Sequence, residues 1–546
     1  MKLKTIHCRS LAIIFALGVA LRLPAQLAVP QHYFTNSPDG ANPGTLVLAG
    51  GWLYGTAVNG GSANSGMAFK LATDGTGYSV FYNFPGGTNG ASPNELLVNG
   101  GTIYGTTYAG GNSGFGTVFY MNTNGAGGTT IYNFTNAPDA EYPIGGLTAG
   151  GGTLYGATTS GGSSGRGALF KLNTNGTGYA VLHSFTNSPD GATPRAGMVL
   201  NAATLYGTTE YGGTHGNGTV FKLNTNGTGY TVIYNFSNTP DAQFPCAALV
   251  ISSNQLYGTA SYGGSHSGGA VFTLNTNGAG YAVLHPFTGP TSPTTNSDGA
   301  YPKNGLWLKG TQLYGTTVSG GTGKYGTLFQ INTNGTGFLV LNNFSSAPDG
   351  INPQGGLVLN SNTLWGTTYL GGTYGNGMAF SLLLSPAITL QPASLNVTNG
   401  NSASYTIAAT GAGQINYQWY FKTNTALAGA TNNTLCFTNA ITNLVGSYLA
   451  VVSNLYGSAT SSPASLVVVT APNLFAFSYN PANGSFSLAM ANLARSTNRL
   501  WVSTNLAAVN PWRVLATNVI ATNGLWFFTD TNTIGKKAVF YRLSVP

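Results

Sequence analysis

Charged residues are scarce in this chain of 546 residues, where Asp, Glu, Lys and Arg together occupy 5% of the positions. The basic residues form no cluster, and this argues against a nucleic-acid partner, which would need Lys and Arg gathered on one surface. Cysteine is also rare: Cys8, Cys246 and Cys436 lie far apart, so we expect no disulfide scaffold. After the N-terminus no apolar run reaches the length of a transmembrane helix, and we find no convincing amphipathic helix.

The N-terminus has the pattern of a secretory signal. Lys2, Lys4 and Arg9 precede an apolar run over residues 11–21, and Ala25 is a small residue suited to cleavage. We predict a signal peptide over residues 1–25, and therefore an exported protein. Its removal takes away four basic residues, so that 15 basic and 11 acidic residues remain and the net charge falls from +8 to +4.

Glycine and aromatic residues are abundant, and they recur with a fixed spacing. Seven aromatic residues, each followed by glycine, recur at a nearly constant interval, and fifteen positions after each of them stands a phenylalanine. A period near fifty residues is the signature of a propeller or a solenoid. The aromatic residues are Tyr54, Tyr104, Tyr155, Tyr206, Tyr257, Tyr314 and Trp365, and the phenylalanines are Phe69, Phe119, Phe170, Phe221, Phe272, Phe329 and Phe380.

Each repeat reads as four short strands separated by turns, as in the copy over 196–200, 204–208, 218–223 and 230–236. The last copy lacks its fourth strand, and a segment that matches this strand stands at the N-terminus over residues 27–34. An open array would leave two unpaired sheet edges. We therefore predict an all-β fold, a seven-bladed β-propeller over residues 26–385 that is closed by the N-terminal strand.

The repeats resemble a known family. The phrases Leu-Tyr-Gly-Thr-Thr, Gly-Thr-Val-Phe and Phe-Ser-Asn-Thr-Pro-Asp, together with a Gly-Gly turn, are similar to the GloVer (Gloeo_Verruco) tandem repeat of bacterial exported proteins, over roughly residues 27–384. The resemblance implies a secreted protein, extracellular or on the surface of a bacterium, and it implies no biochemical role.

The pattern changes after the repeats. Residues 386–470 resemble a bacterial immunoglobulin-like β-sandwich, in which Trp419 would be the buried tryptophan and Tyr448 the tyrosine-corner residue. Residues 471–546 resemble a small C-terminal β-rich module of secreted proteins. Its tryptophans, Trp501, Trp512 and Trp526, favour a hydrophobic core, with a sugar-stacking platform as the alternative.

Repetition separates structural residues from functional candidates. Six of the eleven carboxylates, Asp39, Asp139, Asp190, Asp241, Asp298 and Asp349, occupy one repeated loop and are best explained as turn caps, with calcium ligands as the alternative. The histidines at 32, 183 and 285 alternate with tyrosines on the fourth strand, and we interpret them as filler. Only Glu95, Glu141 and Glu210 could meet near one propeller face, so a catalytic carboxylate pair is poorly supported.

Residues that differ between repeats are better candidates. The loop between the second and third strands has a constant length and a changing content, and in a propeller it shares a face with the loop that enters the next blade. Aromatic, basic and histidine side chains on one face suit binding of sugars or of an anionic polymer. The candidate binding residues are Tyr108, Phe115, Arg166, Glu210, Tyr211, His215, Tyr262, His266, Lys324, Tyr369 and Tyr374.

Three readings of function remain open. The favoured one is an exported, non-catalytic binding or adhesion protein, monomeric, whose partner is a polysaccharide or another cell-surface polymer. We predict no catalytic residue, no metal site, no cofactor, no nucleic-acid partner and no transmembrane segment in the mature chain. The first alternative is a polysaccharide-active lyase or hydrolase that uses Glu210 or Glu141 with Arg166, His215 or Tyr211. The second is a structural component of the cell envelope.

Overall fold

The computed structural model describes residues 28–289, 296–345, 348–469, 473–491, 497–508, 511–519, 525–533, 536 and 538–544. The predicted signal peptide lies outside the described residues. The chain divides into two units, one of residues 22–384 with 411–413, the other holding most of the chain from 385 onward. The fold is all-β: within the described residues the regular elements are strands, apart from two short 3₁₀ turns, η1 (Gly87–Asn89) and η2 (Thr442–Leu444).

One sheet of the first unit shows how a repeat folds. It consists of β16 (Val199–Asn201), β17 (Thr204–Thr209), β18 (Thr219–Asn224) and β19 (Thr231–Asn235), paired antiparallel in that order. The turn between β18 and β19 closes because the Asn226 side chain accepts a hydrogen bond from the backbone N–H of Thr228 at 3.0 Å. Four strands with tight turns were expected for each repeat, and the second to fourth begin and end within one residue of the expected bounds.

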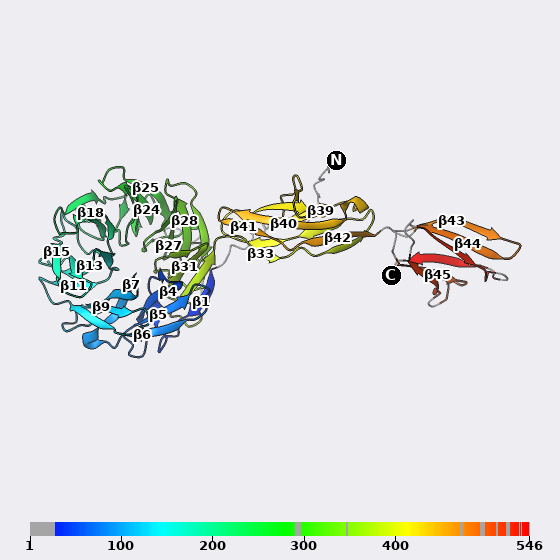
Figure 1. Ribbon diagram of the computed structural model, residues 1–546. Coiled ribbons are helices and arrows are strands. Elements are labelled where there is room, and N and C mark those ends of the chain that lie inside the picture. Colours follow the sequence, from blue (N-terminus) through cyan, green and yellow to red (C-terminus); the bar gives the residue numbers. More distant parts are fainter. Residues whose placement is uncertain are drawn as a thin grey trace. The chain divides into compact units, whose positions relative to one another are not determined.

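Seven sheets of this kind follow one another in the described part of the first unit, arranged around a ring (Figure 1). A two-stranded pair, β20 (Ala242–Gln243) with β23 (Tyr262–Gly263), accompanies them. Three of the other six sheets are β1 (Val29–Tyr33), β32 (Met378–Leu383), β31 (Thr363–Thr368) and β30 (Val358–Asn360); β6 (Ser79–Asn83), β5 (Met67–Ala72) and β4 (Trp52–Asn59), with β3 (Val47–Ala49) and β2 (Ala41–Pro43) both beside β4; and β10 (Thr129–Asn133), β9 (Thr117–Asn122), β8 (Thr102–Ala109) and β7 (Ala91–Asn99). The remaining three sheets are β15 (Ala180–Ser184), β14 (Ala168–Asn173) and β13 (Thr153–Gly161), with β12 (Thr148–Gly150) and β11 (Ala140–Pro143) both beside β13; β25 (Ala282–Thr288), β24 (Ser267–Asn275), β22 (Gln255–Ala260) and β21 (Val250–Ser252); and β29 (Leu339–Asn343), β28 (Thr327–Asn332), β27 (Gln312–Thr317) and β26 (Trp307–Lys309).

The N-terminal strand completes the last sheet. β1 pairs antiparallel with β32, and the backbone N–H of Phe34 donates to the Gly377 carbonyl at 3.1 Å. The same bond, from Phe185 to Gly167, joins the third and fourth strands of an internal repeat at 3.0 Å. A β-bulge interrupts the register of β1 with β32, as it does between β18 and β19. The expected pairing of the two chain segments is therefore present, with the geometry of an internal repeat.

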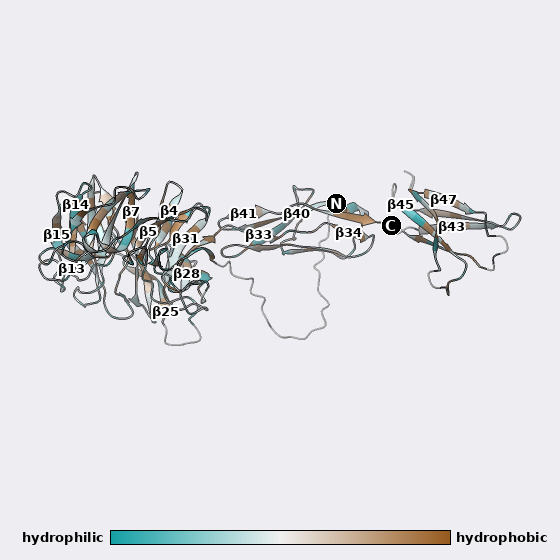
Figure 2. Ribbon diagram, turned by 90° about the horizontal axis from the view of Figure 1, so that it is seen from below, coloured by the Kyte–Doolittle hydropathy of each residue, from teal (hydrophilic) through white to brown (hydrophobic). Residues whose placement is uncertain are grey.

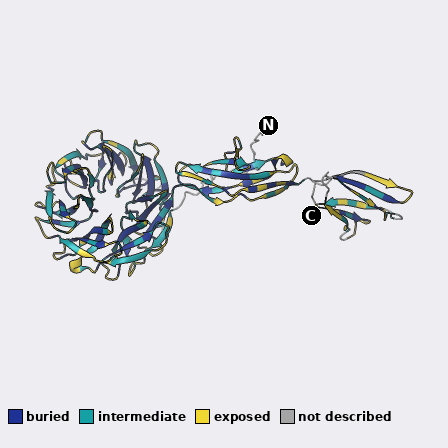
Figure 3. Cartoon of the chain, in the orientation of Figure 1, coloured by how far each residue is buried: buried dark blue, intermediate teal, exposed yellow. Residues whose placement is uncertain are grey.

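Phenylalanine rings join each sheet to the next. The last residue of the fourth-strand segment packs edge-on against the third-strand phenylalanine of the following sheet, as Phe185 does against Phe221 at 5.6 Å between centroids. The contact of Phe34 with Phe69, at 5.1 Å, joins the sheet of β1 to the first complete repeat. These side chains are almost fully buried, and Figure 3 shows buried residues in dark blue along the strands. Figure 2 shows hydrophobic segments in brown and hydrophilic segments in teal on the strands.

The packing explains two repeated glycines. A Cβ on Gly207, the glycine of the aromatic-glycine phrase, would lie 2.5 Å from the ring of Phe221, so only glycine fits beneath that ring. Gly218 has a positive φ of +96°, and a Cβ there would lie 2.7 Å from Pro245 of the next repeat. The positive φ and the close contact with the next repeat both favour glycine at this second position.

The second unit contains two groups of sheets. Between residues 387 and 469 a sheet of β34 (Leu395–Thr398), β42 (Ala464–Val469), β40 (Gly446–Asn454), β37 (Asn416–Phe421), β38 (Thr425–Ala426) and β41 (Gly457–Thr460) is accompanied by two pairs, β33 (Ala387–Leu390) with β36 (Ala408–Thr410) and β35 (Ala403–Thr406) with β39 (Thr434–Phe437). The described residues from 473 to 544 form two three-stranded sheets. One consists of β43 (Asn473–Asn480), β44 (Ser485–Ala491) and β47 (Leu525–Asp530), and the other of β46 (Arg513–Val519), β45 (Thr497–Ser503) and β48 (Phe540–Ser544).

Candidate functional site

The loop that enters each repeat contains a residue with unusual backbone geometry. Directly before a proline, this residue has φ between +55° and +59°, a region that side chains larger than glycine rarely adopt. The conformation is held by hydrogen bonds: the backbone N–H of Phe244, for example, donates to the Asn217 carbonyl of the preceding repeat at 2.9 Å. We call these seven positions the pre-proline residues: Asn42, Ser92, Tyr142, Thr193, Phe244, Tyr301 and Asn352.

Two of the pre-proline residues connect exposed tyrosines into a continuous run of rings. Phe244 packs against Tyr211 at 5.4 Å and against Tyr262 at 5.8 Å between ring centroids. Tyr262 in turn packs against the pre-proline residue Tyr301 at 4.8 Å. Tyr211 is 46% exposed and Tyr262 43% exposed. We call Tyr211, Phe244, Tyr262 and Tyr301 the aromatic row; it lies across neighbouring repeats.

A smaller aromatic group lies in another repeat. The pre-proline residue Tyr142 contacts Tyr108 at 5.1 Å and Phe115 at 5.5 Å, and its backbone N–H donates to the Phe115 carbonyl at 2.9 Å. Four of the predicted binding residues, Tyr108, Phe115, Tyr211 and Tyr262, thus take part in aromatic contacts. Sequence reasoning missed the pre-proline residues that join them, although an aromatic residue before proline in this loop was a visible signal.

A group of polar side chains lies beside the aromatic row. The Glu210 carboxylate, at the end of β17, is 3.2 Å from the Arg195 guanidinium. Glu210 is almost buried, and burial raises the pKa of its carboxyl above the ordinary value, although the charges of Arg195 and Lys303 oppose this shift. The Cys246 thiol donates to the Lys303 carbonyl at 3.7 Å, and burial raises the thiol pKa to about 11. We call Arg195, Glu210, Cys246 and Lys303 the polar cluster.

The glutamates do not share a partner. Glu141 accepts a hydrogen bond from the backbone N–H of Ala137 at 3.0 Å, whereas Glu210 pairs with Arg195. Glu95 lies in β7, and a Cβ on Gly146 would fall 2.8 Å from its carboxylate, so this glycine leaves room for it. Burial raises the pKa of Glu95 to about 7. Of the three, Glu210 alone is joined to a cation by an ion pair among the described residues.

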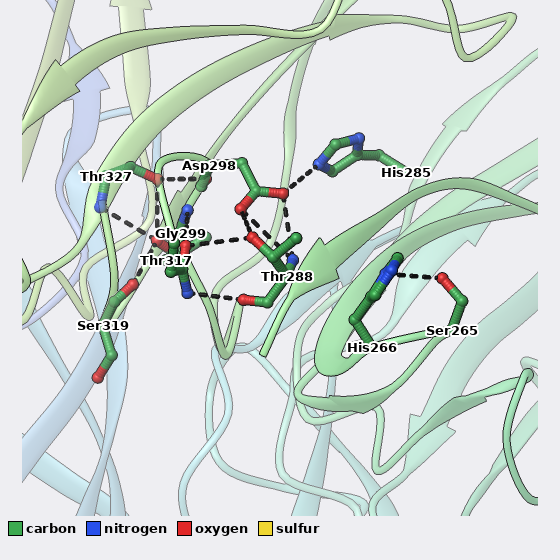
Figure 4. Close-up of polar contacts among 10 residues, drawn as sticks. Ser265, His266, His285, Thr288, Asp298, Gly299, Thr317, Ser319 and Thr327 are labelled. Atoms are coloured by element: carbon green, nitrogen blue, oxygen red, sulfur yellow. Dashed lines mark hydrogen bonds and ion pairs between the residues drawn. The ribbon is translucent and has the colours of Figure 1, made fainter. Parts of the chain in front are cut away.

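The other predicted residues lie in loops, and all of them except the partly buried Tyr369 are exposed. His215 makes a hydrogen bond to the preceding Thr214 hydroxyl at 3.1 Å. His266 makes the equivalent bond to the Ser265 hydroxyl at 2.9 Å (Figure 4). The Tyr369 carbonyl accepts from the Asn42 side chain at 3.0 Å. Arg166, Lys324 and Tyr374 are exposed, and within the described part of the chain no side-chain hydrogen bond or ion pair joins them to other predicted residues. Their grouping with the aromatic row stays a prediction.

The repeated aspartates have more partners than a turn cap requires. Asp190 accepts from the backbone N–H of Thr186 at 2.9 Å and from the imidazole of His183 at 3.0 Å. The ring of His183 stacks on Tyr230 of the next repeat at 3.6 Å, and the Tyr230 hydroxyl donates to the Asp190 carbonyl. Asp298 makes the equivalent bond to His285 at 3.1 Å (Figure 4).

The interpretation of these histidines as filler is therefore wrong. Each of His32, His183 and His285 binds the loop aspartate of its own repeat. In other repeats the Tyr132 and Tyr234 hydroxyls donate to Asp139 and Asp241 in the same way, both at 3.0 Å. Histidine and tyrosine alternate because each places a polar group at the same point, a constraint that strand periodicity alone does not reveal.

In the second unit the tryptophans divide between two environments. Trp526 is 7% exposed and packs with Leu488, Met490 and Leu500. Trp501 donates to the Ser544 hydroxyl at 2.7 Å, and the Arg542 guanidinium lies 4.9 Å from the ring of Trp512. Trp512 also lines a cavity of about 430 Å³. The core interpretation holds for Trp526.

Two absences concern metals and membranes. Across the residues that the structure describes, no three His, Cys, Asp or Glu side chains gather as metal ligands would. Among those same residues no helix has the length and hydrophobicity needed to cross a bilayer.

Comparison with known proteins identifies the repeats. The family model described as "Gloeobacter/Verrucomicrobia repeat" matches residues 17–201, 123–297 and 185–380, which together extend over 17–380 of the 546 residues. No curated protein matches the chain.

Solved structures match a short part of the chain. A titin M4 structure is 24% identical, covers 16% of this chain and 96% of its own length, and has a TM-score of 0.14. The titin I-band fragment I67–I69 is 15% identical and covers 27% of this chain, with a TM-score of 0.20; the match spans 64% of the fragment. Scores of this size support no conclusion about fold or function.

Proposed function

The chain belongs to the Gloeobacter/Verrucomicrobia repeat family, and we propose that it is an exported, non-catalytic binding protein built on a seven-bladed β-propeller. The propeller would comprise residues 26–385 and bind a carbohydrate or another extracellular polymer. The equivalence of the β1–β32 pair to the internal strand pairs supports the closed ring. The signal-like residues 1–25 support export to the extracellular space or the cell surface.

The aromatic row is the observation that supports binding most strongly. Two of its four rings are more than two-fifths exposed, although burying an aromatic ring would be favourable. Its two pre-proline members are held at positive φ by hydrogen bonds between repeats, so the rings are positioned before any ligand arrives. Exposed, preordered aromatic rings suit stacking against sugar rings.

The second unit would serve as spacer and attachment. We propose an immunoglobulin-like sandwich over 386–470, because Trp419 is fully buried and the Tyr448 hydroxyl donates to the Leu444 carbonyl at 2.7 Å. Ile407 and Ala450, both fully buried, would replace the usual disulfide by apolar packing. The β-rich residues 471–546 would attach the protein or contact carbohydrate.

A glycan array probed with the secreted full-length chain tests the proposal. We expect binding to at least one polysaccharide, and we expect the double variant Y211A/Y262A to reduce that binding at least tenfold. Tyr420→Ala, in the other unit, is the matched control and should bind like the wild type. Absence of binding to every glycan, with a folded protein, would favour the structural-component reading instead.

The runner-up function is a polysaccharide-active enzyme, and one observation favours it. Glu210 is a nearly buried carboxyl with a raised pKa, next to Arg195 and followed by Tyr211, and general acids have these properties. Incubation of candidate polysaccharides with wild-type and E210Q protein, followed by assay for new chain ends, distinguishes the two functions. Chain ends produced by the wild type and lost in E210Q would establish the enzyme.

A further inference from the structure

The residue after each repeat's pre-proline–proline pair differs between repeats. It follows Pro194, Pro245 and Pro302 as Arg195, Cys246 and Lys303 in three consecutive repeats. At the equivalent positions of other repeats it is neutral, as in Gly44, Ile144 and Gln354. At this position of the repeat, where the backbone geometry is constant, positive charge therefore occurs in one sector of the ring alone.

This sector is the one that carries the aromatic row. Tyr301 and Lys303 are separated by Pro302 alone, and Phe244 and Cys246 by Pro245 alone. Two Cα atoms separated by one residue lie within about 7 Å of each other. Glu210, which binds Arg195, directly precedes Tyr211. The aromatic row and the polar cluster are thus formed by the same short segments of chain.

The charges in the polar cluster do not balance. Arg195 is paired with Glu210, but one carboxylate uses only part of the five-donor fork of a guanidinium. Lys303 is exposed, and among the described residues no carboxylate forms an ion pair with it. Two cations and one carboxylate leave about one positive charge beside exposed aromatic rings. A ligand that offers sugar rings and a carboxylate would complement both features.

We propose that the ligand of this face is an acidic glycan, with sugar rings on the aromatic row and a uronic-acid carboxylate held by Lys303 and Arg195. The inference rests on the proposed function and names its substrate class. A nucleic acid fits less well, because a phosphate backbone needs many more cations than the two present here. Because this position is neutral in the other repeats, the contact with Lys303 and Arg195 lies in one sector and involves a few sugar residues.

The experiment compares one polyuronate with its carboxyl-reduced form, which has the same sugar rings and linkage without the charge. With the full-length secreted protein, we expect the acidic form to bind at least tenfold more tightly at low salt and the difference to shrink as salt rises. Lys303→Gln should weaken binding of the acidic polymer about tenfold and leave the carboxyl-reduced polymer unaffected.

Lysine 309 offers a matched control in the same repeat. It ends β26, at the far end of the segment that begins near Lys303, and its ammonium donates to the Ser361 carbonyl at 2.9 Å. Lys309→Gln removes the same charge from the protein and should bind both polymers like the wild type. Thermal unfolding of both variants checks that the fold is intact, and exposed Lys303 is a position where substitution leaves the fold in place.

The outcomes distinguish failure of the acidic-glycan inference from failure of the proposed binding function. Equal affinity for the acidic and reduced polymers, or a K303Q variant indistinguishable from K309Q, overturns the acidic-glycan inference while Y211A/Y262A still tests the binding face. Competition by single-stranded DNA as effective as by free polyuronate also overturns it. Binding of neither polymer, with no hit on the glycan array, refutes the proposed function and the inference with it.

Discussion

The strand interiors and the loop face of the repeats differ in how much their side chains vary. In the strands the same side chain makes the same packing contact in every copy, as Phe221 does over Gly207. In the loops the backbone is equally constant, since the pre-proline residues share one φ, but their side chains range from Asn42 to Tyr301. A repeat protein can therefore keep its scaffold geometry fixed while it changes the chemistry that the scaffold presents.

The largest effect is expected at the joint between the N-terminal strand and the repeats. Phe34→Ala removes a fully buried ring that contacts Phe69, and it should lower the free energy of unfolding by about 3–5 kcal/mol. Phe185→Ala, at the equivalent internal position, is the reference. Urea unfolding of both variants should give similar losses; a much smaller loss for F34A would mean that the joint is weaker than an internal one.

The aromatic-glycine phrase comes next. Gly207→Ala places a Cβ 2.5 Å from the Phe221 ring and should cost about 1–3 kcal/mol in the free energy of unfolding, because the surrounding core cannot yield. Gly101→Ala, with no atom within 4 Å and no positive φ, is the control and should leave stability unchanged. Chemical denaturation measures both, and equal stability of the two variants would contradict the packing argument.

Glu95 should make stability depend on pH in the direction opposite to a paired carboxylate. Its pKa in the folded state is raised to about 7, so its favourable contribution is full below the ordinary value of 4.5 and is lost as the pH rises through 7. Glu95→Gln should therefore stabilise the protein by about 1–3 kcal/mol near pH 9 and change little near pH 4. Urea titrations at both pH values test this, and an equal effect at the two would refute it.

In the histidine–aspartate pairs, replacing the histidine by alanine should destabilise the protein, and replacing it by tyrosine should not. His183→Ala removes the donor to Asp190 and should cost about 1–2 kcal/mol in the free energy of unfolding. His183→Tyr should recover most of this loss, since Tyr132 makes the equivalent bond in another repeat.

The same pair has a defined pH dependence. Burial alone would raise the pKa of the Asp190 carboxyl, but the hydrogen bonds from His183, Thr186 and Tyr230 outweigh burial and lower this pKa. This contribution is present above the ordinary value of 3.8 and is lost as the pH falls below it. Asp190→Asn should remove the contribution, so that the stabilities of variant and wild type converge in acid; thermal scans across the acid range would reveal a failure to converge.

The smallest effect on stability is expected in the loop face. His215→Ala changes an exposed side chain that bonds only the neighbouring Thr214, and it should alter the free energy of unfolding by less than about 0.5 kcal/mol. Differential scanning calorimetry checks this. A large loss would mean that the variable loops are part of the scaffold, and the contrast between loops and strands would then fail.

Much of the fold could be predicted from the sequence because the repeat spacing is rigid. The strand order within a repeat and the β1–β32 pair follow from matching phrases. The site was predictable in part: Glu210, Tyr211 and Tyr262 were named, but their partners Arg195, Phe244 and Lys303 were not. Arg195 lies in the loop that enters the repeat of Glu210, and Phe244 and Lys303 lie in the same loop of the next two repeats. The strand periodicity does not reveal that this loop turns back against the end of the second strand, as the backbone bond from Tyr211 to the Ala192 carbonyl shows.

The repeat length, the strands and the residues that differ between copies can be read from the amino-acid sequence, because they depend on spacing and local backbone preference. Which variable residues meet depends on how the folded segments pack. Phe244 joins Tyr211 to Tyr262, and Arg195 joins Glu210, because hydrogen bonds between repeats hold the entering loop at positive φ against its neighbour. Side-chain proximity across two chain segments arises from their packing, and neither segment encodes it alone.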